Sequence, residues 1–240
     1  MGASLKTEAV VLRSIRYGEA DRIIHCYTPH LGRIGAIAKG SRRTKSRFGG
    51  RLEPFFRLNL VLHVGRSDLH TVTAAETLDG FSALRHHGPS LDSAARACDA
   101  TSRLFETDEP HPGVYHLLVN ELRLLDHQPE QATLANQLAF RLKLLMAAGL
   151  APQLASCAAC GEREELFGFS PDAGGMVCTA CQANAFAIDP EAHAFMVDAL
   201  GQPLAQAPTA TPRALAQVER AVTQTGEHHA HVRLRAAAAG

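Results

Sequence analysis

The chain has 240 residues, of which 46% are hydrophobic and 20% are charged, and its 24 basic residues balance its 24 acidic ones. This composition is that of an ordinary globular protein, with enough chain for one large domain or two smaller ones. No uninterrupted apolar run approaches the roughly 18 residues of a membrane span, and the N-terminus lacks the layout of a secretory signal. We therefore expect a cytoplasmic protein.

The charge is unevenly distributed along the chain. Residues 1–79 hold 13 basic and 7 acidic residues, whereas residues 80–240 hold 11 and 17. An electropositive segment in a neutral protein indicates a polyanionic partner, most simply nucleic acid. A solvated basic surface would account for the same count, so charge alone leaves both interpretations open.

The first 80 residues have the pattern of short β-strands. Apolar and β-branched residues, partly alternating with polar ones, predict five strands, at residues 5–14, 21–28, 33–39, 56–64 and 69–78. The longest interruption lies between the third and fourth strands, where a five-stranded OB barrel carries its extra segment. We predict an OB-fold β-barrel domain over residues 1–80.

A run of basic residues fills this interruption. Seven Lys or Arg residues occur within nineteen positions, with no acidic residue between the first and the last. They are Arg33, Lys39, Arg42, Arg43, Lys45, Arg47 and Arg51. Glycines and small hydroxyl residues between them allow the backbone to approach phosphate closely. Arg33, at the start of the third predicted strand, is the one we expect to contribute least.

One aromatic residue within this run suggests a contact to bases. Phe48 follows Arg47 and is the first choice for stacking on an unpaired base, with Tyr17 and Tyr27 as weaker candidates. The run is not a nucleotide-binding P-loop, because Ser41 stands where that motif requires Lys. The predicted nucleic-acid contacts are Lys39, Arg42, Arg43, Lys45, Arg47, Phe48 and Arg51.

After residue 80 the hydrophobic period changes to that of helices. A first amphipathic helix begins near Leu91, and further helices are predicted at residues 114–125, 134–150, 190–205 and 212–224. Prolines suit the first turns of several of these helices. We predict an all-helical domain over residues 81–240, which makes the chain an α+β multi-domain protein.

Four cysteines form the most specific motif of the chain. They follow the pattern Cys-x2-Cys, seventeen residues, Cys-x2-Cys, and are Cys157, Cys160, Cys178 and Cys181. Two such pairs supply the four thiolates that tetrahedral Zn²⁺ prefers. Since four thiolates leave no open position for water, we predict one structural zinc ion in an insert over residues 151–187. The two remaining cysteines, Cys26 and Cys98, lie in apolar stretches and are expected to be buried.

The N-terminal half resembles the RecO family of bacterial DNA repair proteins. The resemblance is carried by Leu5–Leu12 (LKTEAVVL), Gly18–Arg22 (GEADR), Ala38–Arg43 (AKGSRR) and Leu52–Phe55 (LEPF), in matching order and spacing. The helical zone with an inserted four-cysteine cluster also fits this family, so that the resemblance covers nearly the whole chain.

The resemblance implies an N-terminal OB fold, a helical domain with a zinc-binding insert, and a role in recombinational repair. Proteins of this family bind single- and double-stranded DNA and anneal complementary strands. With the partner RecR they promote loading of the recombinase RecA onto DNA coated by single-strand-binding protein, and some bind that protein directly. The family's basic loop corresponds here to Lys39, Arg42, Arg43, Lys45, Arg47 and Arg51. A cytoplasmic, nucleoid-associated location would follow.

Two rival functions use the same features. A non-enzymatic adaptor with an OB barrel and a structural zinc could bind only proteins, with the basic residues contacting an acidic partner. A zinc hydrolase or deaminase is disfavoured, because the ligand set is closed and the His-x-Glu motif of deaminases is absent from the sequence. No Ser/His/Asp or paired-carboxylate pattern is recognisable, and we expect a protein without enzymatic activity.

Overall fold

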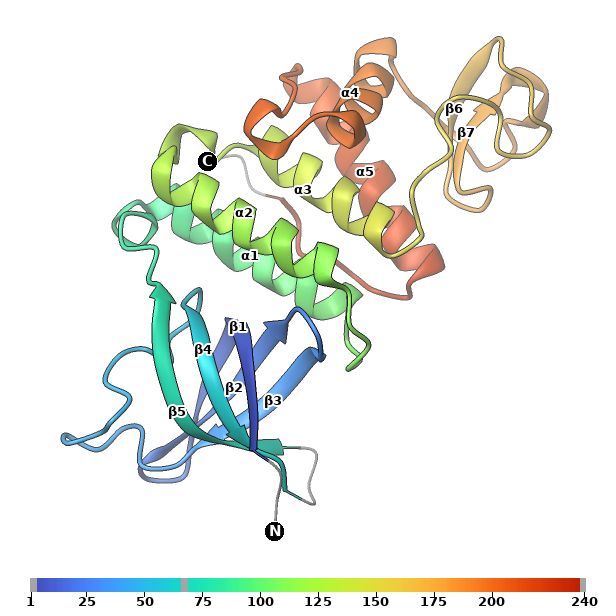
Figure 1. The fold of residues 1–240 in the computed structure, drawn as a ribbon. Helices are drawn as coiled ribbons and strands as arrows, with labels where there is room; N and C mark the ends of the chain where they lie inside the picture. Colours follow the sequence, from blue (N-terminus) through green and yellow to red (C-terminus); the bar gives the residue numbers. More distant parts are fainter. Residues whose placement is uncertain (1–3, 66–68, 238–240) are drawn as a thin grey trace. The chain divides into compact units, whose positions relative to one another are not determined.

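The computed structural model describes residues 4–65 and 69–237. The chain divides after Pro129 into two compact units (Figure 1). Among the described residues, none of the helices is long and apolar enough to cross a membrane. Within the part of the chain that the structure describes, the first unit contains a β-barrel and two α-helices, and the second contains three α-helices and a small three-stranded sheet.

Five strands form the closed barrel of the first unit. They are β1 (Ser4–Tyr17), β2 (Asp21–Thr28), β3 (Gly32–Ala38), β4 (Arg57–His63) and β5 (Leu69–Asp79). Their order around the barrel is β1-β2-β3-β5-β4, with β4 pairing back onto β1. Among the barrel strand pairs of the described residues, β3–β5 is parallel and the others are antiparallel. The predicted five-stranded OB-type barrel is confirmed, and each strand lies within a few residues of its predicted position.

Alternation along the strands fills the barrel core. In β4, Leu58, Leu60 and Leu62 are buried, while the intervening Asn59 is exposed, as expected when successive side chains point to opposite faces. Strand β1 closes the barrel because it pairs with both β2 and β4. Its first half pairs with β4 and its second half with β2, and an irregularity in register between Val11 and Arg13 lies within the pairing with β2. Its last residues extend into a long β1–β2 hairpin.

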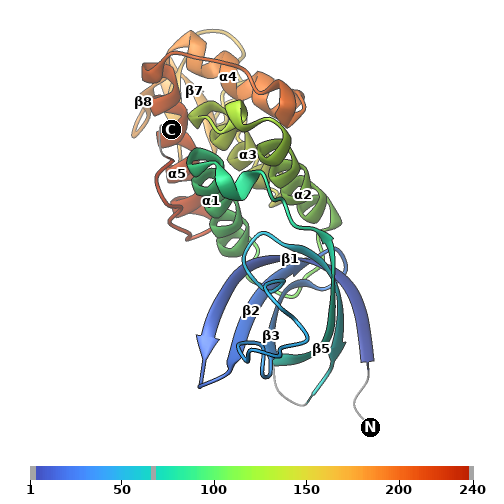
Figure 2. The same ribbon diagram turned by 90° about the vertical axis from the view of Figure 1, so that its left-hand side faces the viewer.

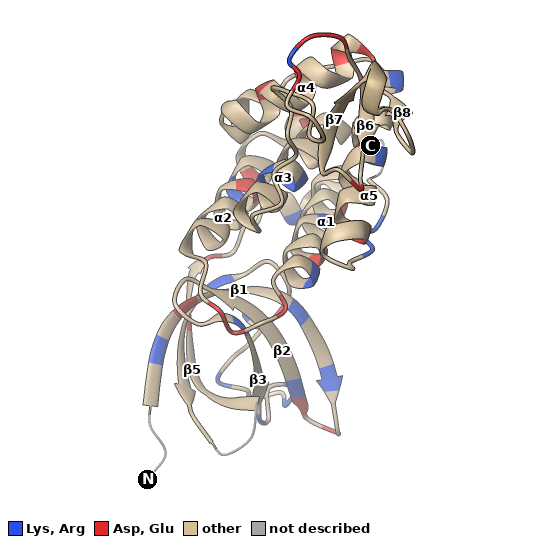
Figure 3. Cartoon of the chain, turned by 90° about the vertical axis from the view of Figure 1, so that its right-hand side faces the viewer, with Lys and Arg blue, Asp and Glu red and all other residues tan. Residues whose placement is uncertain are grey.

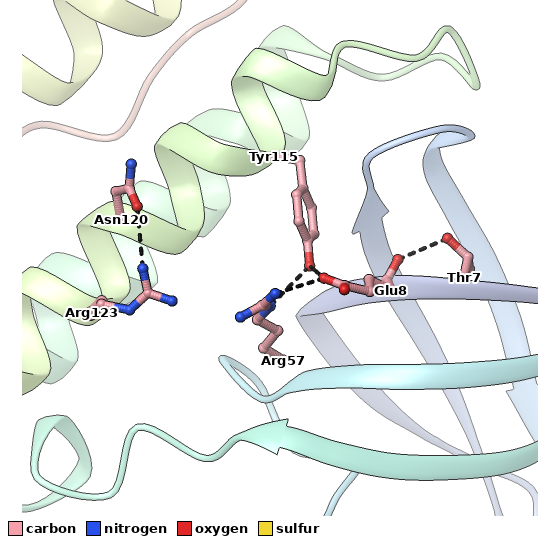
Figure 4. Close-up of polar contacts among 6 residues, drawn as sticks. All are labelled: Thr7, Glu8, Arg57, Tyr115, Asn120 and Arg123. Carbon is pink, nitrogen blue, oxygen red and sulfur yellow. Dashed lines mark hydrogen bonds and ion pairs between the residues drawn. The ribbon is translucent and has the colours of Figure 1, made fainter.

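Two helices pack in the same compact unit as the barrel. They are α1 (Gly88–Leu104) and α2 (Pro112–His127). Tyr115 of α2 donates a hydrogen bond to the Glu8 carboxylate of β1 at 2.9 Å, and the Arg57 guanidinium of β4 contacts the same oxygen at 2.8 Å (Figure 4). The unit therefore extends past residue 80, where the predicted domain ended, because side chains of the barrel and of α2 share buried and polar contacts.

The second unit is built on helices α3 (Leu134–Ala147), α4 (Pro190–Gly201) and α5 (Pro212–His229). Helix α3 differs from its predicted single apolar stripe, because every residue from Ala135 to Leu142 is buried. Short 3-10 turns occur at Leu84–His86, Pro129–Gln131, Thr179–Cys181 and Leu204–Gln206. Between α3 and α4 lies a small sheet of strands β6 (Leu166–Ser170), β7 (Gly175–Cys178) and β8 (Phe186–Ala187). It lies beside the three helices, at the edge of its unit (Figure 1).

Candidate nucleic-acid interface and metal centre

The basic loop, residues 39–56, connects β3 to β4 and folds back onto the barrel (Figure 2). Two apolar side chains anchor it: Phe48 is 1% exposed and Leu52 is 2% exposed, and both belong to the barrel core. At its end the backbone pairs with β1, since the amide of Phe55 donates to Val11 at 2.8 Å and the amide of Val11 donates to Phe56 at 2.9 Å. The loop is thus held at the middle and at the end, although it contains no helix or strand.

Phe48 cannot be a base-stacking residue, and this prediction was wrong. Its ring is buried among core side chains, and the Arg47 guanidinium lies 4.9 Å from the ring centre. A segment of irregular backbone needs apolar anchors to keep one conformation, and the single Phe of this charged run serves as one. Tyr27 is also fully buried, against Phe105. Of the three proposed aromatic residues, Tyr17 alone is exposed, by 54%.

The start of the basic loop is fastened to the turn between β1 and β2. The amide of Gly40 donates to the Asp21 carboxylate at 2.7 Å, and the amide of Arg42 donates to the carbonyl of Ala20 at 2.8 Å. The Arg42 guanidinium donates to the carbonyl of Gly18 at 3.3 Å. Figure 3 shows Lys and Arg positions both on this loop and on the β1–β2 hairpin. The two segments therefore lie against each other, and both carry cations.

The six predicted basic contacts share two properties. All are exposed, and within residues 4–65 and 69–237 no carboxylate lies within ion-pair distance of any of them. They are Lys39, Arg42, Arg43, Lys45, Arg47 and Arg51. Six arginines elsewhere lie within ion-pair distance of a carboxylate, for example Arg96 with Asp92 at 2.6 Å and Arg103 with Asp99 at 2.8 Å. Cations without a carboxylate partner remain available to phosphate.

Arg33 stands apart from this set. Its guanidinium donates to the carbonyl of Glu106 at 3.2 Å and lies 3.4 Å from the Ser102 hydroxyl, so that it holds the segment after α1. Sequence analysis missed two other cations, Arg13 and Arg16, which are exposed on the β1–β2 hairpin. These two residues lie about 20 positions or more before the basic run in the sequence. Only folding of the β1–β2 hairpin brings the turn after β1 against the basic loop.

The four predicted metal ligands come together in the second unit. The sulfur atoms of Cys157, Cys160, Cys178 and Cys181 all lie within 4.8 Å of one another, and the Sγ atoms of Cys160 and Cys178 are 3.7 Å apart. Four sulfurs at about 2.3 Å from one tetrahedral ion lie roughly 3.8 Å apart. The donor set therefore fits a metal ion that prefers soft ligands, such as zinc.

Backbone geometry shapes each Cys-x2-Cys turn. The amide of Gly161, whose φ of 82° is in the left-handed region, donates to the carbonyl of Cys157 at 2.8 Å. The backbone amides of Cys178, Cys160 and Ala159 stabilise the Cys157 thiolate and lower its pKa to about 6. Hydrogen bonds with Cys160 and Cys178 raise the pKa of Cys181 to about 12. The Cys157 thiol thus ionises more readily than the Cys181 thiol, and a cation bound by the sulfurs would displace a proton from the latter.

The cysteines also form the small core beside the metal site. Its buried members are Cys157, Val177 and Cys178, and Leu166, Ala173, Cys181 and Ala185 pack against them in part. A core in which three of these seven side chains are cysteines offers little apolar surface of its own. We infer that a metal at this site would act structurally, since all four ligand positions are filled by protein.

The fold and these two sites define a class of protein: an OB-type barrel with an unpaired basic surface, joined to a helical unit with a four-thiol cluster. Family models agree with this description. The model for the N-terminal part of recombination protein O matches residues 1–81, and the model for its C-terminal part matches residues 90–237. The chain belongs to the RecO family of DNA repair proteins.

Individual relatives match over most of their length. The DNA repair protein RecO of Rubrobacter xylanophilus is 37% identical over 92% of this chain and 90% of its own. The RecO protein of Anaeromyxobacter sp. is 34% identical over 97% of this chain and 94% of its own. That of Cutibacterium acnes is 40% identical over 74% of each. The resemblance found in the sequence is confirmed.

Proposed function

We propose that this protein is a non-enzymatic recombination mediator that binds single- and double-stranded DNA through the basic loop. The observation that carries the proposal is the set of six exposed cations without carboxylate partners among the described residues. They are displayed on a loop that Phe48 and Leu52 hold against the barrel. An anchored loop presents its cations in a fixed arrangement, which lowers the entropy lost on binding.

The same surface would promote annealing of complementary strands. Two DNA strands repel each other through their phosphates, and each Lys or Arg contact neutralises one phosphate and releases a condensed counterion. A loop that contacts both strands lowers this repulsion while leaving the base edges free to pair. The protein contributes no covalent chemistry in this mechanism.

Family membership supports the remaining parts of the proposal. We expect this protein to bind RecR, to promote loading of RecA onto DNA covered by single-strand-binding protein, and to act at the nucleoid. Direct binding of single-strand-binding protein by the helical unit is a further expectation. Co-purification with each partner, and RecA filament formation on coated DNA, measure these interactions directly.

We propose that the four cysteines hold one zinc ion. The spacing of their sulfurs supports zinc, and so does the small core they form. When bound, the ion would join two distant turns and supply folding free energy that the apolar residues of the insert cannot. The thiolates of Cys157, Cys160, Cys178 and Cys181 would be its ligands.

The decisive experiment replaces three loop cations, in the variant Lys39→Ala/Arg42→Ala/Arg43→Ala. Six contacts to single-stranded DNA predict a slope of log K against log salt of about −4, and three contacts predict about −2. Affinity at low salt and the rate of strand annealing should both fall. Filter binding across a series of salt concentrations measures affinity and slope together.

A matched control removes the same charge elsewhere. Arg96, Arg103 and Arg213 are each paired with an aspartate, and their triple alanine variant should keep the affinity and slope of the unmodified protein. An equal loss of DNA affinity in both variants would show that net charge alone causes the effect, and would contradict DNA binding by the basic loop. Absence of any salt-dependent DNA retention by the unmodified protein would favour the protein-binding adaptor.

A further inference from the structure

Beside the basic loop, the outer face of the β1–β2–β3 sheet has an apolar centre. Ile15 lies opposite Ile23, and Ile23 lies opposite Ile37, in the registers of the two strand pairs. The neighbouring residues Ile24, Ala36 and Ala38 belong to the barrel core. Because successive side chains alternate between faces, the three isoleucines lie on the outside of the barrel. All three are only partly buried.

Tyr17 continues this row at the end of β1. It lies two residues beyond Ile15 on the same strand, and therefore on the same face, and it pairs in register with Asp21. Its side chain is 54% exposed, the largest exposed fraction among the large hydrophobic side chains of the described residues. An exposed tyrosine beside a partly exposed isoleucine row is a platform of apolar surface on an otherwise charged barrel.

The charges around this platform are mostly positive. Arg13, on the same face as Ile15, and Arg16 are exposed, and the basic loop begins at the neighbouring turn. Of the two acidic residues at the hairpin end, Asp21 accepts the hydrogen bond of the Gly40 amide and Glu19 lies in the turn itself. Burial and the nearby Arg33 and Arg13 lower the pKa of His25, as expected in a positive field.

We propose that Tyr17 and the adjoining isoleucine row hold an unpaired base, so that this face binds single-stranded nucleic acid in preference to duplex. The inference rests on the proposed DNA binding and adds a site to it. In a duplex the faces of the bases are stacked on one another, whereas in a single strand they are free to stack on an aromatic ring. The cations bind both forms through phosphate, and the platform adds affinity for one form only.

Intrinsic fluorescence tests the contact directly. The chain contains three tyrosines and no tryptophan, and Tyr27 and Tyr115 are 0% and 1% exposed. Stacking of a thymine on Tyr17 should therefore quench the tyrosine emission when oligothymidylate is added. Tyr17→Phe should bind oligothymidylate with nearly unchanged affinity, because the ring remains, but should lose most of the quenching.

Affinity measurements separate this inference from the proposed function. Tyr17→Ala should bind oligothymidylate about 10-fold more weakly, with an unchanged salt slope and with duplex affinity within twofold of the unmodified protein. Phe167→Ala, which removes a partly exposed ring from the second unit, is the control and should change neither affinity.

Two results would overturn the inference while leaving the proposed function intact. In the first, the unmodified protein shows salt-dependent DNA binding and Tyr17→Ala binds oligothymidylate equally well. In the second, Tyr17→Ala loses affinity for RecR but not for DNA, which would make the face a protein-docking surface. If the unmodified protein binds no DNA at all, the proposed function itself fails.

Discussion

The basic loop and the four-cysteine insert, residues 151–187, are held in one conformation by different means. Each is a mainly irregular segment that carries a functional or structural site, and each must keep one conformation against a large loss of chain entropy. The basic loop inserts Phe48 and Leu52 into the large core of the barrel. The insert, residues 151–187, instead gathers four thiols around one point. A loop beside a large core can be anchored by apolar side chains, whereas a small insert with little core of its own would gain its stability from a bound metal, as proposed above.

Removal of the metal should produce the largest effect. Structural zinc supplies roughly 10 kcal/mol or more of folding free energy in small modules, so the double variant Cys157→Ser/Cys178→Ser should release zinc and open residues 151–187 to proteases. Metal analysis should find about one zinc per chain in the unmodified protein. Limited proteolysis then locates the opened segment.

The matched double variant Cys26→Ser/Cys98→Ser changes the two cysteines outside the cluster, both buried, and should keep its zinc. Because the loop uses apolar anchors, DNA binding by the zinc-free variant should remain within a few-fold of the unmodified protein. Two results would contradict a structural zinc in the insert. One is a zinc content well below one per chain in freshly purified protein, and the other is equal protease resistance with and without the cysteines.

Removal of the apolar anchor should have the second-largest effect. Phe48→Ala deletes a ring buried in the barrel core and should lower the free energy of unfolding by about 3–5 kcal/mol, as measured by denaturant unfolding. Phe48→Leu retains most of the apolar volume and should cost much less. Full stability in Phe48→Ala would show that the ring does not anchor the loop.

The polar contact of Glu8 with Arg57 and Tyr115 should have the smallest effect on stability of the three. Hydrogen bonds from Arg57 and Tyr115 hold the pKa of Glu8 below its usual value of about 4.5. A lowered pKa in the folded state means that the stabilisation is present above pH 4.5 and is lost as the pH falls through the folded-state value. Since the Glu8 side chain is 40% exposed, we expect only about 1 kcal/mol.

Unfolding free energies measured from pH 3 to pH 7 test this contribution. Glu8→Gln should be less stable than the unmodified protein near neutral pH, and the difference should shrink below pH 4.5. Glu76→Gln, on strand β5, is a control for the loss of a carboxylate from the barrel. If the difference in unfolding free energy between Glu8→Gln and the unmodified protein stays constant across this range, the charge of the Glu8 carboxylate does not contribute to stability.

The strands and the metal site were largely predictable from the sequence. Alternation placed the strands, and Cys-x2-Cys spacing identified four ligands that the structure brings together. Both signals are local, because each depends on residues a few positions apart. The role of Phe48 was not predictable in this way: an aromatic residue in a charged run looks exposed until the loop is seen to fold back over the barrel. The contact of Tyr115 with Glu8 was not predictable either, since it joins residues more than a hundred positions apart.

The sequence alone determined that a basic run follows the third strand of a small barrel, that four cysteines are spaced as metal ligands, and that the chain resembles the RecO family. Only the tertiary structure decided which members of the run are unpaired, that Arg33 serves a structural contact, and that Tyr17 is the exposed aromatic residue beside them. The physical reason is that charge and spacing are properties of the chain. Burial and ion pairing, in contrast, depend on which distant residues folding brings into contact.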